Sequence, residues 1–180
     1  MDSSALPAPG AHAFLDESKQ RTYVVTIALA PPGDLNVLRR ALRAQLLPGQ
    51  SAVHFKHERD GRKRQVLRAM LALPVIAMVY ECDLPGQNRA RQACLRALVD
   101  DLIQLKAERL VLEIAEGDLA ADRRTLFEAV RASGQELRYD HVRPATEPML
   151  WVSDAVAWAW CRNTQWRRQV APLVAQVRKV

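Results

Sequence analysis

AFLDES, residues 13–18, is the stretch that decides the fold, and YVVTIALA, residues 23–30, follows it after the polar turn KQRT. The first run is apolar until it ends in two acids and a hydroxyl, and the second is rich in β-branched residues. Two such runs around a short polar turn predict a β-hairpin. We expect the first strand to end at Asp16 and to deliver its carboxylate to one edge of a sheet. Because Asp and Ser also favour turns, this stretch alone leaves ordinary turn chemistry open.

After the hairpin, apolar segments alternate with segments of helical periodicity. The expected helices are residues 35–46, 66–73, 91–105, 119–132 and 149–161, and a helical stripe of Val170, Val174 and Val177 continues to the end. The expected strands are residues 53–57, 75–80, 110–115 and, nearer the sheet edge, 137–143, with a polar turn at residues 58–64. Residues 75–80 are apolar throughout, which is typical of a strand buried on both faces in a parallel sheet. The alternation predicts one three-layer α/β domain with a mixed sheet over residues 12–180, preceded by a flexible tail over residues 1–11.

The amino-acid composition limits which classes of protein the chain can belong to. The chain has 180 residues, of which 49% are hydrophobic and 26% charged, so it can build a real core and is not disordered throughout. The net charge is +6, and all but five of the 26 basic residues are arginine, which permits a nucleic-acid partner without requiring one. Three cysteines without a CxxC pair indicate neither a zinc knuckle nor a disulfide framework, so we expect a reducing cytoplasm. No apolar run is long enough to cross a membrane.

Three acids stand where a carboxylate is costly. Asp16 ends the first strand, Glu113 interrupts the apolar strand 110–115, and Asp154 lies in a helix that is apolar on almost every side. The carboxyl ends of adjacent parallel strands meet at one edge of a sheet, and a crossing helix can add a third acid there. Clustered carboxylates repel one another unless a cation neutralises them, and oxygen-only ligands suit Mg²⁺ or Mn²⁺. The pattern therefore predicts a metal site of Asp16, Glu113 and Asp154.

Each acid also has a structural explanation. Asp154 could cap a helix that starts later than expected, and Glu113 could pair with Arg109 or with an arginine of a covering helix. Only the combination of the three favours a catalytic site.

These residues carry a resemblance to a known family. The order Phe14-Leu15-Asp16-Glu17-Ser18, then His54-Phe55, then a late acidic strand, then LWVSDAVAW at residues 150–158 resembles the domain of unknown function 3800 family. The family's Asp-Glu motif is matched by Asp16 and Glu17. Its C-terminal motif carries a Gln three residues before an Asp; here Trp151 replaces that Gln, while Asp154 is kept.

The resemblance implies a ribonuclease H-like fold and metal-dependent hydrolysis of nucleic acid. Ribonuclease H-like nucleases place one acid on the first strand, one on a central strand and one on the last helix, which is the order of Asp16, Glu113 and Asp154. We therefore expect a Mg²⁺- or Mn²⁺-dependent nuclease or phosphodiesterase. The alternative is a catalytically silent domain of the same fold that binds nucleic acid or a protein partner.

Other polar residues are candidates near this site. His54 is a candidate for moving a proton, and Lys56 for contacting a phosphate; as a strand, residues 53–57 would place both on one side, with His57 on the other. Glu17 and Ser18 could orient Asp16 or bound water, and Asp118 and Asp122 follow the Glu113 strand closely enough to reach the same edge. Each could instead be a turn or capping residue. The remaining candidates are a basic phosphate-binding face (Arg39, Arg40, Arg43, Arg62, Lys63, Arg64, Arg167, Arg168) and four tryptophans, of which Trp158 and Trp160 are assigned to the core.

Overall fold

The computed structural model describes residues 9–19, 22–114 and 117–180. The predicted hairpin is present: β1 (His12–Lys19) pairs antiparallel with β2 (Tyr23–Ala30). The expectation that the first strand ends at Asp16 is wrong, because β1 continues to Lys19 and Asp16 lies opposite Thr26 inside the ladder.

The other strands are β3 (Ile76–Cys82), β4 (Arg109–Glu113), β5 (Arg138–Val142) and β6 (Val174–Lys179). They complete a six-stranded mixed sheet in the order β5-β4-β1-β2-β3-β6. The pairs β1/β4, β4/β5 and β3/β6 are parallel, whereas β2 is antiparallel to both neighbours, so β3 is parallel only to β6. The edge position predicted for β5 is confirmed.

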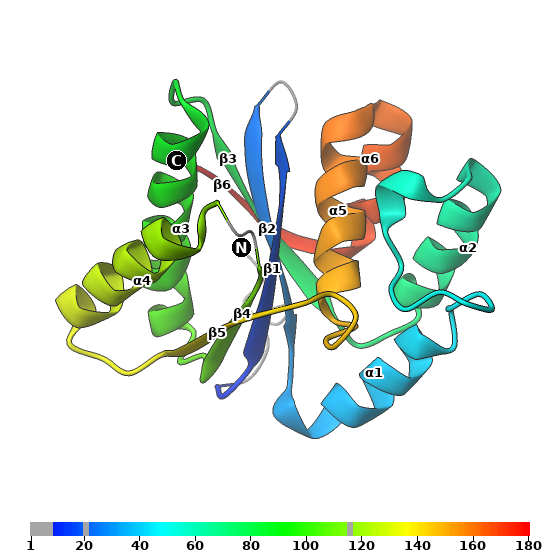
Figure 1. The fold of residues 1–180 in the computed structure, drawn as a ribbon, viewed down its shortest axis with the longest axis horizontal. Coiled ribbons are helices and arrows are strands. Elements are labelled where there is room, and N and C mark those ends of the chain that lie inside the picture. The colour runs from blue at the N-terminus through cyan, green and yellow to red at the C-terminus, as the bar shows by residue number, and fades with distance from the viewer. Residues whose placement is uncertain (1–8, 20–21, 115–116) are drawn as a thin grey trace.

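Helices cover both faces of the sheet, as expected for a three-layer α/β domain (Figure 1). One face carries α3 (Gln87–Gln104) and α4 (Leu119–Ser133), and the other carries α1, α2, α5 and α6. The bounds on this second face are α1 Leu35–Arg43, α2 Asp60–Leu71, α5 Leu150–Arg162 and α6 Thr164–Val170, with short 3₁₀ turns η2 (Pro32–Asp34), η3 (Phe55–His57) and η4 (Ala171–Leu173). In the part of the chain described, no helix is long and apolar enough to span a membrane.

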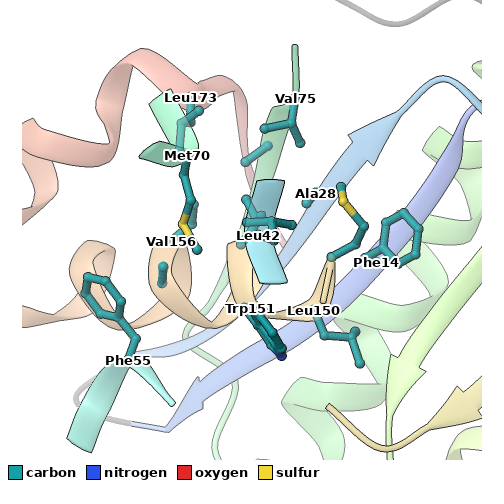
Figure 2. Packing of buried hydrophobic residues seen from close by; sticks show 14 of the residues in the cluster. Phe14, Ala28, Leu42, Phe55, Met70, Val75, Leu150, Trp151, Val156 and Leu173 are labelled. Atoms are coloured by element: carbon teal, nitrogen blue, oxygen red, sulfur yellow. The ribbon is translucent and has the colours of Figure 1, made fainter. Parts of the chain in front are cut away.

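Each face of the sheet has its own hydrophobic core, because successive strand residues point to opposite sides. Ala13 and Leu15 pack toward the α3 side, while Phe14 packs toward α5. Figure 2 shows Phe14 and Ala28 of the hairpin beside Leu150 and Trp151 of α5. Every residue of β2 is buried, so this strand is the centre of the molecule.

The strand predicted at residues 53–57 is wrong. Residues 55–57 form the 3₁₀ turn η3, because Phe55 is fully buried against Trp158 and Trp166 and its N–H bonds to a side chain instead of a strand. The polar turn predicted at residues 58–64 is also corrected, since α2 begins at Asp60.

The helical stripe predicted near the C-terminus is wrong too. Residues 174–179 form strand β6, in which Val177 points outward and is 43% exposed. Three valines spaced by three or four residues fit a helix, but the alternating burial of β6 has period two. In α4, Phe127 is 56% exposed, because the buried stripe runs through Asp122, Thr125 and Leu126.

Residues 1–8 of the predicted tail lie outside the described residues. Gly10 and Ala11 belong to the fold: the Gly10 N–H donates to the Lys106 carbonyl, the Ala11 carbonyl accepts from Glu108, and Ala11 is buried. The predicted strand 110–115 also runs into undescribed residues, since 115 and 116 are not described.

Candidate active site

Asp16 and Glu113 lie on two adjacent strands, at the point where the pairing of those strands ends. β1 and β4 are parallel, and their register ends at the pair Leu15–Leu112, so the next residue on each strand is an acid. One Asp16 oxygen accepts the backbone N–H of Glu17 at 2.7 Å. The chain therefore brings together two of the three predicted acids by strand pairing alone.

Asp154 is placed by the packing of α5 on the hairpin. The hydroxyl of Ser153 donates to the Phe14 carbonyl of β1 at 2.5 Å and accepts the Ala28 N–H of β2 at 3.2 Å. The hydroxyl of Thr26 donates to the Ser153 carbonyl at 2.9 Å. These buried bonds hold the helix across both strands, and Asp154 follows directly on the side of Asp16.

The three carboxylates repel one another. Burial raises the pKa of Asp16 well above its usual value, and the charges of Asp154 and Glu113 raise it further. Burial and the charge of Asp154 raise the pKa of Glu113 in the same way. The pKa of Asp154 is raised by burial, although the Phe55 N–H and the nearby histidines oppose this rise. The three acids thus share one electrostatic environment that favours protons or cations.

The turn η3 closes one side of this cluster. The Phe55 N–H donates to Asp154 Oδ2 at 2.8 Å. His54 lies near enough to lower the pKa of both Asp154 and Glu113, and His57 lowers that of Asp154. Sequence reasoning missed His57 because it assumed a strand; with three residues per turn, positions 54 and 57 lie on the same side.

A groove of about 690 Å³ includes Asp154 in its lining, with five cations and the further acids Glu17 and Asp60. Its lining includes Lys56 and Ser18, both predicted near the site, and Ser18 also lies beside the Cys161 thiol, whose burial-raised pKa it lowers. The cations of the groove are Lys19, Lys56, Lys63, Arg64 and Arg162. Arg162 was not a candidate from the sequence, although its place in the last turn of the Asp154 helix was a usable signal.

The remaining predicted residues lie in an ion network on the α3 side of the sheet. Arg91 pairs with Glu17 and makes two hydrogen bonds of 2.6 Å to Asp122, which is buried. Although burial alone would raise it, the hydrogen bonds from Arg91 and the nearby His141, whose Nε2 lies 3.4 Å from Oδ2, lower the pKa of Asp122. Asp118 lies 3.5 Å from Lys19. Asp118 and Asp122 thus pair with basic side chains and are not part of the group around Asp154.

Arg91, like His57 and Arg162, is a residue that sequence reasoning missed. It lowers the pKa of Asp16 and lines, with Asp16 and Glu113, a small cavity of about 120 Å³. Its signal was a charged side chain on the otherwise apolar stripe of α3, where a buried arginine requires acidic partners.

The donor chemistry of the cluster fits a hard divalent cation. Three carboxylates with raised pKa values form an all-oxygen set whose repulsion a cation would relieve. Their present arrangement is not a finished cage: within residues 9–19, 22–114 and 117–180, no group of three His, Cys, Asp or Glu side chains is placed to enclose an ion.

No model of a known protein family matches the chain. No curated protein is similar to it either. Among solved structures, this chain is similar to a chain in the structure of the PCNA–ribonuclease HII complex from Archaeoglobus fulgidus, with 15% sequence identity and a TM-score of 0.57. The similarity covers 91% of this chain and 76% of that chain.

The chain has a ribonuclease H-like fold. Its mixed sheet, opening hairpin and helices on both faces agree with that neighbour and confirm the predicted fold class. At this identity the likeness establishes the fold alone. The resemblance to the domain of unknown function 3800 family stays a prediction.

Proposed function

We propose that this protein is a Mg²⁺- or Mn²⁺-dependent nuclease or phosphodiesterase that acts on nucleic acid. The observation that supports the proposal is the mutual charge repulsion of Asp16, Glu113 and Asp154, together with a groove that five cations line and that includes Asp154. The acids supply ligands for a cation, and the groove supplies positive charge for the phosphate backbone.

Each side chain has a distinct role in this proposal. Asp16, Glu113 and Asp154 would hold the metal, and at least one of them would turn to do so. A bound ion would supply an activated water and charge stabilisation at the phosphate. His54 lies near Glu113 and Asp154 and would move a proton to or from the reacting oxygens. Lys56, exposed in the groove, would contact a substrate phosphate.

Two residues predicted around the site would act indirectly. Glu17 holds Arg91, the cation that lowers the pKa of Asp16, and its own N–H bonds to that carboxylate. Ser18 lines the groove next to β1. The fold neighbour is named as a ribonuclease HII, which agrees with a nucleic-acid substrate but supports the proposal only through the fold.

Incubation with Mn²⁺ or Mg²⁺ and a panel of labelled RNA, DNA and hybrid substrates tests the proposal. We expect cleavage by the wild type, abolished by chelator, and a rate at least about 100-fold lower for Asp16→Asn, because a catalytic metal contributes several kcal/mol. Asp140→Asn is the matched control, since Asp140 is an exposed acid that pairs with Arg109 on the sheet edge. Equal cleavage by the wild type and Asp16→Asn would refute the proposal.

A specific observation favours the alternative, a catalytically silent domain that binds nucleic acid or a protein partner. Asp154 already accepts the Phe55 N–H, and no set of three ligating side chains among the described residues is positioned around an ion. This alternative predicts binding of nucleic acid through the groove with chelator present and no cleavage with either metal.

A further inference from the structure

Two tryptophans line one wall of the groove. The rings of Trp158 (α5) and Trp166 (α6) pack edge to face, with centroids 5.2 Å apart and an interplanar angle of 78°. Phe55 packs edge-on against both, at 5.3 Å and 6.3 Å. Trp166 is buried and Trp158 is partly exposed in the groove. The pair is therefore a rigid aromatic block at the groove surface, close to the turn that holds Asp154.

Three cations make cation–π contacts with these two rings. Lys63 Nζ lies 4.7 Å from the centroid of the Trp158 ring, and the Arg162 guanidinium lies 5.7 Å from the same ring. The Arg64 guanidinium lies 5.3 Å from the Trp166 centroid. The negative face of an indole attracts a cation and restricts where it can go. The three charges thus come from two separate helices but are held at one wall.

Most of this charge is not neutralised. Lys63 is buried, donates to the Glu58 carbonyl and lies 3.7 Å from Asp60, so its charge is already compensated. For the portion of the chain that the structure describes, no ion pair involves Arg64 or Arg162. Both line the groove that includes Asp154. Two arginines without an acidic partner, fixed on aromatic rings in a concave surface, are suited to an anion with several oxygens.

We propose that Arg64 and Arg162, held on the Trp158–Trp166 pair above the buried Lys63, form a phosphate subsite that binds the backbone of a polynucleotide independently of metal. The proposal deepens the proposed function, on which it rests for the identity of the ligand. The subsite holds a phosphate along the groove from the carboxylates and so anchors the strand whose scissile bond lies at Asp154. Trp158 is a positioning residue here, because it orients two of the cations.

This role differs from base stacking. The Trp158 ring already carries Lys63 and Arg162 and meets the edges of Phe55 and Trp166, so a base has little free ring to cover. Binding should therefore depend on phosphates rather than bases. An abasic oligonucleotide separates the two roles, since stacking requires bases whereas the subsite does not.

The test measures binding of a fluorescent single-stranded 12-nucleotide oligomer, normal or abasic, to the full chain in chelator as salt is varied. Arg162→Gln and Arg64→Gln should each reduce the salt slope by about 0.7, which weakens binding about fivefold at 0.1 M salt. Trp158→Leu should weaken it similarly although no charge is lost, and Trp158→Phe should recover part of the affinity. Arg131→Gln is the matched control, because Arg131 is exposed on α4 across the sheet.

Unchanged binding by Arg64→Gln and Arg162→Gln would overturn the subsite, as would strong binding of the normal oligomer with none of the abasic one. If the wild type cleaves with Mn²⁺ while the arginine variants keep its KM, the subsite fails and the proposed function stands. If binding depends on the arginines but no metal supports cleavage, the subsite stands and the proposed function fails.

Discussion

The pKa of Asp154 is shifted in opposite directions by different parts of its surroundings. Its carboxylate accepts the Phe55 N–H at 2.8 Å and has His54 and His57 nearby, yet burial still raises its pKa. Its charge in turn raises the pKa of Asp16 and Glu113. A helix cap would stabilise the folded state, whereas an acid kept near two others without a cation destabilises it.

The sign of the pH dependence follows from the raised pKa. The folded protein keeps a proton on Asp154 that the unfolded chain releases at lower pH. The free energy of unfolding therefore falls as pH rises from the ordinary carboxylate pKa of about 4 to the raised value, and the loss is complete above it.

We predict that Asp154→Asn raises the melting temperature of the metal-free protein at pH 7. An Asn oxygen can still accept the Phe55 N–H, while the repulsion of Asp16 is removed. Relief of about 1 kcal/mol corresponds to about 2–4 °C for a chain of this size. Thermal melts in chelator at pH 4 and pH 7 measure the difference, which should vanish at pH 4. A variant that melts below the wild type at pH 7 would show that Asp154 is a stabilising residue instead.

At the scale of elements, one helix and one hairpin make the site. Ser153 of α5 bonds to both strands of the hairpin through Phe14 and Ala28, residues more than 120 positions away in the chain. The same turn of α5 presents Asp154. The position of the third acid therefore depends on the docking of α5 and not on the helix alone.

We predict that Ser153→Ala lowers the free energy of unfolding by about 1–3 kcal/mol, because it leaves the Phe14 carbonyl and Ala28 N–H buried without this partner. Urea unfolding measures the loss. Ser133→Ala is the matched control: that hydroxyl also makes two hydrogen bonds within a helix end, but it lies at the surface of α4 and should cost about 1 kcal/mol or less. Equal stability of the wild type and Ser153→Ala would show that α5 is docked by apolar contacts alone.

At the scale of the whole molecule, acids on the two faces of the sheet have pKa values that are shifted in opposite directions. On the α3 side, Arg91 compensates Glu17 and Asp122, and the pKa of Asp122 is lowered. On the α5 side, the pKa values of Asp16, Glu113 and Asp154 are raised. A cation that binds only the folded state should therefore stabilise the whole molecule through the second face.

We predict that Mn²⁺ raises the melting temperature of the wild type progressively with concentration. At 100 times the dissociation constant the gain is about 2.7 kcal/mol, or about 5–10 °C. Asp16→Asn and Asp154→Asn should lose this shift, while Asp140→Asn on the edge strand β5 should keep it. A wild type whose melting is indifferent to Mn²⁺ would argue against a metal site and for the silent-domain alternative.

Part of the site could be predicted because it depends on short-range patterns. The acids of β1 and β4 each end or interrupt an apolar run, and parallel strands align such positions. His57 and Arg91 could not be placed in the same way. The side on which His57 lies depends on whether residues 53–57 form a strand or a turn, which the packing of Phe55 decides. Arg91 acquires its role only when β1 and α4 supply Glu17 and Asp122.

The sequence by itself determined the opening hairpin, the alternation of strands and helices, and the presence of three acids in apolar surroundings, because these follow from periodicity between near neighbours. Only the tertiary structure decided that β6 is an edge strand, that Asp122 belongs to the opposite face from Asp154, and that Lys63, Arg64 and Arg162 share one wall. The reason is physical: a segment's own pattern sets which side is apolar, but its partners depend on contacts between residues far apart in the chain. Ser153 and Phe14, 139 positions apart, are such a pair.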